Sequence, residues 1–376
     1  MTRWRKAIAA AVLATGAVSS LAHGQERENS GSQGPKLRVR AACDLPGEGG
    51  AYFDIRWSDG DALVLQPRSG VRRVSISKKC EIGETVLPGS RELKEPGRNW
   101  TALTSSGDLV AASSSSALIW ADGAPSPGKP FSLESLRGGI GDVDLRGTRL
   151  VVLGMPSETL YREEANWSTT IWAADFRDGR LGPFEPVWKE REAEKRAGGL
   201  VSLFRHNNNG AGALRQSSDG DILVSFAYRS EIARLSPSGE VKARWALAEL
   251  TGVSDEDPAT YARLIGDRVS ATDYDRWVGK AAVLVDDVLF LGRTPAAIVR
   301  LVGKETGQSA EWVLVLLDTE PPTKLRIPSA GVDPHARLRA DVTSRGEIVI
   351  LATQRIAHVG DQDGISARLL VLELNN

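Results

Sequence analysis

Histidine, the side chain that most often acts as a general acid or base, is sparse in this 376-residue sequence. The chain has four His, and those beyond the first 24 residues are His206, His335 and His358. The sequence contains no nucleophile elbow, His-Glu-x-x-His motif, P-loop or dinucleotide-binding glycine motif. Cys43 and Cys80 have neither a neighbouring His nor a local nucleophile signature. The sequence therefore identifies no catalytic residue and no cofactor, and an enzyme is the less favoured interpretation.

The most unusual polar string is HNNNG at residues 206–210. Asn carbonyls can ligate Ca²⁺, and Asp142 and Asp54 are carboxylates that would complete such a site. The same string suits a turn in which Asn side chains bond to their own backbone. We favour the turn, and we predict no metal site.

A hairpin pattern recurs along the chain and predicts the strands that would position the polar residues named above. Gly lies between two apolar, β-rich runs in 52–65, 100–112, 142–153, 213–226 and 339–351. Gly accepts positive φ at a tight turn, and the flanking Ser and Asp can close the turn with side-chain hydrogen bonds. A sixth copy without Gly is predicted at 281–291, with Asp286 and Asp287 at its turn. Repeats of about 40 to 50 residues are typical of four-stranded propeller blades.

One stretch carries a family resemblance. SDGDILVSF at 218–226, followed by SEIARLSPSGEVKARW at 230–245, resembles a blade of six-bladed propellers of the NHL type. Elsewhere in 37–376 the resemblance rests on the Gly turns. It implies an all-β, six-bladed β-propeller and a style of binding, with no particular substrate. An irregular all-β protein with common Asp-Gly hairpins is the alternative. Six-bladed lactonases hold a metal at the axis with carboxylate and Asn ligands, which keeps a hydrolase in view.

Propeller sites gather near the central axis, where each innermost strand begins. Aromatic, cationic and amide groups converging there suit a polar or saccharide-like ligand, whereas each one taken singly is more typical of a solvated rim. The candidate ligand-binding residues are Tyr52, Arg98, Asn99, Trp100, Asp142, His206, Asn208, Trp277, Lys280, His335, Arg337 and Arg339.

Ring closure assigns a role to both ends of the chain. A ring of sheets leaves open edges unless its last blade combines strands from the two ends. We therefore expect residues 37–42 to join 347–351 and 367–374 in one sheet, so that N- and C-terminal strands close one blade. Cys43 would lie at that junction. Because two Cys in an oxidising compartment most simply pair, a Cys43–Cys80 disulfide is predicted.

The first 24 residues read as an export signal. Arg3, Arg5 and Lys6 precede an apolar stretch that ends in Ala22-His23-Gly24. The stretch is too short and Ala-rich to span a bilayer comfortably, so a cleaved signal is favoured over an anchor. Removing these three cations changes the net charge from -1 to -4. That balance does not favour nucleic acid, which requires a basic face.

The predicted organisation is thus a signal peptide at 1–24, a disordered leader at 25–36 and a β-propeller domain at 37–376, with no membrane span in the mature chain. The predicted protein is periplasmic or secreted. Its expected role is that of a binding or scaffold module of the cell envelope, with a polar ligand or an envelope protein as partner. The alternative is a metal-dependent, lactonase-like hydrolase with an axial site.

Overall fold

The computed structural model describes the residues 35–45, 52, 54–58, 60–66, 70–77, 81–88, 102–106, 108–112, 116–120, 131–132, 138–156, 171–177, 180–188, 212–225, 231–251, 283–301, 311–332, 336–353 and 367–375. All of them belong to one compact unit, Pro35–Asn376. The predicted signal peptide and nearly all of the predicted leader lie outside the described residues, so the boundaries at 24 and 36 stay predictions. Strand β1 begins at Lys36.

The described strands pair into six antiparallel sheets. Their bounds, in chain order, are β1 (Lys36–Leu45), β2 (Asp54–Ser58), β3 (Asp61–Gln66), β4 (Gly70–Ser75), β5 (Glu81–Pro88), β6 (Ala102–Ser106), β7 (Asp108–Ala112), β8 (Ser116–Trp120), β9 (Phe131–Ser132), β10 (Gly138–Arg146), β11 (Arg149–Pro156), β12 (Ile171–Arg177), β13 (Arg180–Leu181), β14 (Glu185–Trp188), β15 (Ala213–Gln216), β16 (Ile222–Ser225), β17 (Glu231–Leu235), β18 (Val241–Ala246), β19 (Val283–Leu291), β20 (Thr294–Leu301), β21 (Glu311–Leu316), β22 (Thr323–Arg326), β23 (Arg337–Val342), β24 (Ile348–Thr353) and β25 (Ala367–Asn375). A short helix, α3 (Leu247–Thr251), follows β18.

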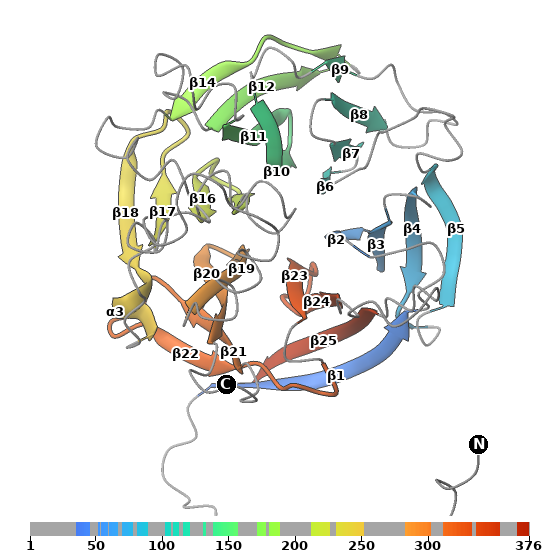
Figure 1. The fold of residues 1–376 in the computed structure, drawn as a ribbon, viewed down its shortest axis with the longest axis vertical. Coiled ribbons are helices and arrows are strands. Elements are labelled where there is room, and N and C mark those ends of the chain that lie inside the picture. Colours follow the sequence, from blue (N-terminus) through green and yellow to red (C-terminus); the bar gives the residue numbers. More distant parts are fainter. Residues whose placement is uncertain are drawn as a thin grey trace, which may run out of the picture. The chain divides into compact units, whose positions relative to one another are not determined.

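The sheets follow one another around a common axis. Sheets β2–β5, β6–β9, β15–β18 and β19–β22 each take four consecutive strands, and in another sheet β12 pairs with both β13 and β14. The first strands contact one another in the order β2, β6, β10, β15, β19 and β23, and β23 returns to β2 (Figure 1). The predicted all-β propeller is therefore confirmed.

The sheets stay together because their strands are apolar on both faces. Ile348–Thr353 is buried along almost its whole length, which is typical of a strand covered on both sides. Its Ile350 packs with Leu338 and with Ile298 and Leu314 of the preceding sheet, in one cluster. The core thus lies between neighbouring sheets.

The sheet that combines the first and last described strands closes as expected. β1 pairs antiparallel with β25, from Leu37 opposite Leu374 to Leu45 opposite Ala367. The sheet order is β1–β25–β24–β23, so the N-terminal strand is its outermost member (Figure 1). Cys43 lies in β1, whereas Cys80 lies outside the described residues, and the disulfide stays a prediction.

Four of the five predicted Gly turns lie in the described part of the chain and form as predicted, whereas Gly107, the turn residue of 100–112, lies outside it. Gly60, Gly147, Gly220 and Gly346 all have positive φ. In the β15–β16 turn, the Ser217 hydroxyl accepts hydrogen bonds from the backbone N–H groups of Asp219 and Asp221 at 3.3 and 3.0 Å. Thr343 closes the β23–β24 turn in the same way.

One predicted turn is wrong. Asp286 and Asp287 lie within β19, and the chain turns instead at Gly292 and Arg293, between Leu291 and Thr294. The paired acids resembled a loop because Asp is rare in strands, but both carboxylates are used inside the ring, as shown below. Gly292 has a φ of 64°, so the usual turn chemistry was present six residues further along.

Candidate functional site

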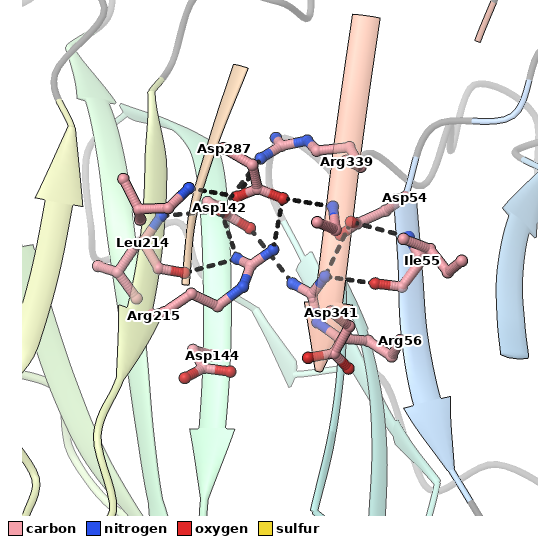
Figure 2. Close-up of polar contacts among 12 residues, drawn as sticks. Asp54, Ile55, Arg56, Asp142, Asp144, Leu214, Arg215, Asp287, Arg339 and Asp341 are labelled. Carbon is pink, nitrogen blue, oxygen red and sulfur yellow. Dashed lines mark hydrogen bonds and ion pairs between the residues drawn. The ribbon is translucent and has the colours of Figure 1, made fainter. Parts of the chain in front are cut away.

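Charged side chains meet where the innermost strands approach the axis. We call six of them the axial charge cluster: Asp54 and Arg56 of β2, Asp142 of β10, Arg215 of β15, Asp287 of β19 and Arg339 of β23. Figure 2 shows these carboxylates and guanidinium groups pointing toward one another. None of the six side chains is more than 7% exposed. Three acids and three bases therefore share a space from which water is largely excluded.

Asp142 is the most connected acid of the cluster. One carboxylate oxygen accepts from the N–H of Val143, the next residue, at 2.9 Å. The other accepts from the N–H of Leu214 at 2.9 Å and from Arg215 Nη1 at 3.0 Å. Arg339 Nη1 lies 3.5 Å from the same oxygen, and Arg56 Nη2 lies 3.8 Å from the first. Asp142 thus connects strands from four sheets.

Asp287 plays a corresponding part on the other side of Arg215. Its carboxylate accepts from the N–H of Val288 and, at 2.9 Å, from the N–H of Ala340 in the next sheet. Arg215 Nη2 lies 3.0 Å from Asp287 and therefore bridges it to Asp142. The register of β10 shifts immediately before Asp142, and that of β19 shifts immediately before Asp287. Such bulges redirect side chains, and here each precedes an Asp that reaches the neighbouring sheet.

Two further acids connect neighbouring sheets nearer the hairpin turns. Asp144 accepts a hydrogen bond from the N–H of Gln216 at 2.7 Å. Asp341 accepts one from the N–H of Trp57 at 2.7 Å, which spans the junction between the last and first innermost strands. Carboxylates that accept backbone N–H bonds at a junction replace the ladder bonds that two separate sheets lack. These Asp residues therefore fasten one sheet to the next.

The charges of the cluster stabilise one another. Burial alone would raise the pKa of Asp142, but Arg215, Arg339 and Arg56 together outweigh burial and hold that pKa below its usual value. Burial would likewise lower the pKa of Arg215, but Asp287 and Asp142 raise it. Asp142 and Arg215 are accordingly charged near neutral pH.

Asp286 differs from its neighbour Asp287. It faces Trp312, whose Nε1 donates to it at 3.1 Å, and Arg300, whose Nη2 lies 3.3 Å away. Burial raises the pKa of Asp286, and the opposing effects of Arg300 and Arg337 do not cancel it. Arg337 in turn has its pKa lowered to about 10 by burial and by nearby Arg339. The surroundings therefore stabilise the anionic form of Asp286 less than that of Asp142.

We therefore predict that Asp286→Asn costs at most about 1 kcal/mol at pH 7. A group whose folded pKa is raised contributes stability below its unfolded pKa and loses it as pH rises through the folded pKa. The free energy of unfolding of wild type should consequently rise relative to that of Asp286→Asn as pH falls from 7 toward 4. Urea unfolding of both proteins at several pH values measures the difference, and a gap that stays constant with pH would contradict the assignment.

The axial carboxylates are poorly suited to hold a metal ion. Asp54 and Asp142, the acids considered for a calcium site, both contact guanidinium groups: Arg56 Nη1 lies 2.9 Å from Asp54, and Arg215 lies 3.0 Å from Asp142. Among the residues that the structure describes, no group of three or more His, Cys, Asp or Glu is arranged to hold a metal. A cation would have to displace the guanidinium groups that already neutralise these acids.

The structure places four of the twelve candidate ligand-binding residues. Asp142 and Arg339 belong to the axial charge cluster, and Arg337 lies beside Asp286 at the start of β23. Tyr52 is only 2% exposed, packs in the core beside β2, and has its pKa raised to about 12 by burial. The other eight lie outside the described residues: Arg98, Asn99, Trp100, His206, Asn208, Trp277, Lys280 and His335.

The sequence reasoning missed Arg56, Arg215 and Asp287. By its sequence pattern, Arg56 belongs to a hairpin strand, Arg215 to a Gly-turn repeat and Asp287 to a predicted turn, so none of the three is expected at the axis. A signal was present, because Asp or Arg recurs in short strands that are otherwise buried, such as ALRQ at 213–216. A buried charge needs a partner, so a set of such strands predicts a shared ionic cluster.

Neither a protein-family model nor a curated protein sequence matches the chain. Solved structures match the fold at low identity. A member of the duf4221 family from Bacteroides vulgatus is 8% identical with a TM-score of 0.51, and the match covers 91% of this chain and 99% of that one. It supports the fold alone.

Two further neighbours have TM-scores below 0.5. Regucalcin from Agrobacterium tumefaciens, a calcium-binding protein, is 10% identical at a TM-score of 0.45, with 85% of this chain and 90% of that one covered. PorZ, a surface component of the type-IX secretion system of Porphyromonas gingivalis, is 10% identical at 0.39, and the match covers 81% of this chain but only 30% of PorZ.

Proposed function

We propose that this chain is an exported, six-bladed propeller that acts as a binding or scaffold module of the cell envelope. The observation that carries the proposal is that the axial charges are used in contacts within the protein itself. Asp142, Arg215 and Asp287 are engaged with one another and with the backbone of neighbouring sheets, at distances of 2.9 to 3.0 Å. Groups used in this way hold the ring rigid, and a rigid scaffold suits recognition because it positions the residues that bind.

The export part rests on the basic, apolar and small-residue pattern of residues 1–24. Among the described residues, no helix is long and apolar enough to cross a membrane. The direct test is to express the full chain in a Gram-negative host and to measure the intact mass of the protein in the periplasmic fraction. A mature protein that starts at Gln25 supports the proposal, and an uncleaved protein confined to the cytoplasm contradicts it.

The same preparation tests the disulfide. Peptide mapping without reduction should recover a cross-linked pair containing Cys43 and Cys80, because these are the only two Cys of the chain. Two separately alkylated cysteines would reject the bridge and weaken the case for an oxidising compartment.

The alternative, a metal-dependent hydrolase, is not favoured, because guanidinium groups lie against the carboxylates that would be its ligands. We predict that millimolar Ca²⁺ or Zn²⁺ leaves the melting temperature of the purified mature protein unchanged. A ligand that binds only the folded state raises stability, so an ion at the axis would reveal itself as an upward shift. Asp54→Asn tests where any shift arises, since a rise that this variant abolishes would revive the metal site.

A further inference from the structure

Two neighbouring hairpins of the sheet β10–β14 are each closed by a pair of arginines. Arg146 lies directly opposite Arg149 across the β10–β11 turn, and Arg177 lies opposite Arg180 across the β12–β13 turn. We call these four residues the arginine tips. Other described hairpins close on different pairs; for example, Ser58 faces Asp61, and Leu291 faces Thr294.

The arginine tips lie on one face of their sheet. Residues directly opposite in an antiparallel pair share a face, and so do alternate residues of one strand. Arg149 is opposite Asp175, which is two residues before Arg177 on β12. The two hairpins are joined by a hydrogen bond from the N–H of Phe176 to the carbonyl of Thr148 at 2.7 Å. The four cations therefore form one continuous group.

Little in the described part of the chain neutralises this group. Arg177 pairs with Asp175 at 3.4 Å, but both side chains are more than 60% exposed. Arg149 donates to the carbonyl of Pro237 at 2.7 Å, which holds it in place without cancelling its charge. Arg146 and Arg180 are exposed and have no ion pair with a described residue. Along the sequence, Asp178 comes directly after Arg177 and two residues before Arg180.

Like charges directly opposite in a hairpin destabilise it, so this arrangement weakens the free protein. Stability sacrificed at a surface is typical of a binding function. Arginine also matches carboxylate groups in a bidentate geometry that lysine lacks, and all four residues are arginine. We propose that the arginine tips bind an acidic segment of a partner protein. This inference rests on the proposed function, since it names the chemistry of the partner that a binding module would recognise.

The neighbouring structure favours side-chain recognition over strand addition. β13 and β14 both pair with β12, and the N–H of Gly182 bonds to the carbonyl of Asp175, so the outer edge of β12 is already covered here. A lipid surface fits less well, because proteins that lie on membranes insert apolar side chains beside their cations. Among the residues whose burial the structure describes, Val241 on β18 is the one large apolar side chain that is exposed.

Fluorescence anisotropy with labelled poly-L-glutamate tests the proposal, and poly-L-glutamine serves as the uncharged probe. We expect the mature protein to bind only poly-L-glutamate, with affinity that falls as salt increases. Arg146→Gln/Arg180→Gln should weaken binding at least about tenfold. Arg293→Gln/Arg345→Gln removes the same charge from exposed residues on two other hairpin turns and should weaken it less than about twofold. Equal losses in the two double variants would overturn the proposal.

A stability readout separates this role from a structural one. Because like charges are relieved, Arg146→Gln/Arg180→Gln should melt at or above the temperature of wild type while binding less. A clearly lower melting temperature would mean that the arginines hold the sheet together, which overturns the inference. Tighter binding to phosphatidylglycerol vesicles than to the peptide would also overturn it, in favour of a membrane. Failure of these tests leaves the export result untouched, so the two proposals are tested separately.

Discussion

Asp142→Asn is expected to lower the free energy of unfolding by about 3 to 5 kcal/mol, the cost of breaking a buried ion pair on one side only. The carboxylate is fully buried and faces Arg215, Arg339 and Arg56. An amide in its place offers one acceptor where two were used, and it presents an N–H group to donors. The Nε atoms of these three arginines are already buried without a hydrogen-bond partner in the described structure, so no other acceptor can replace the lost carboxylate oxygen.

The control is Asp175→Asn on β12, a strand of the same sheet. Asp175 also pairs with an arginine, Arg177 at 3.4 Å, but its side chain is 65% exposed. An exposed pair of this kind contributes about 0 to 1 kcal/mol, so this variant should unfold almost as wild type does. Urea denaturation of the purified mature proteins measures both. Equal, small losses would mean that water reaches the axis and screens the charges there.

A second variant keeps the test informative if Asp142→Asn does not fold. Asp142→Asn/Arg339→Gln removes one cation together with the anion and should recover part of the lost stability, because coupled buried charges are not additive. A double variant that is as unstable as the sum of the two single changes would contradict a shared cluster.

The second large effect is expected from deleting β1, residues Lys36–Leu45. This strand covers the edge of β25 along nine pairs, and its Leu37 and Leu45 are buried in the clusters on either side of the sheet. Without it, the apolar strand Ala367–Asn375 becomes an exposed edge. Edges of this kind pair with other chains, so we expect the deleted protein to aggregate and to lack a cooperative melting transition.

Deleting residues 25–34 is the matched control, since it removes as many residues just before β1 and leaves every described pair in place. That variant should elute as wild type does in size-exclusion chromatography and melt at the same temperature. A synthetic peptide of residues Lys36–Leu45, added during refolding, should restore part of the soluble protein. A β1-deleted chain that is soluble and melts as wild type does would show that the ring does not need this strand.

The turns illustrate what local sequence is able to determine. The side-chain hydrogen bonds of Ser217 follow the prediction that flanking Ser and Asp close the Gly turns, because donor and acceptor lie within four residues of one another. In the β23–β24 turn the same role falls to Thr343, a residue that the prediction did not single out. The pairing of β1 with β25 was also predictable, although about 330 residues separate the strands, because a ring has two ends and one way to cover both edges.

The axial charge cluster shows where sequence reasoning stops. Arg215 and Asp287 are 72 residues apart, and Arg56 and Asp142 are 86 apart, so nothing local joins them. Each of these four residues lies in a strand whose hydrophobic pattern predicts that it is buried. The pattern does not predict which charged residue of another sheet will pair with it. The Asp286–Asp287 pair was read as a turn because its partners, in β21 and β23, are brought close only when the sheets pack.

By itself, the sequence determined the all-β class and the repeated hairpins with their turn chemistry, because the alternation of apolar residues and the conformation of glycine act over a few residues. It also determined the strand that closes the ring, because the edges of a ring of sheets must be covered. Only the tertiary structure decided which charges share the axis and which strand ends carry opposed arginines. Those contacts depend on the register and the order of sheets around the ring, and electrostatic pairing in a buried space is set by distance through that space rather than along the chain.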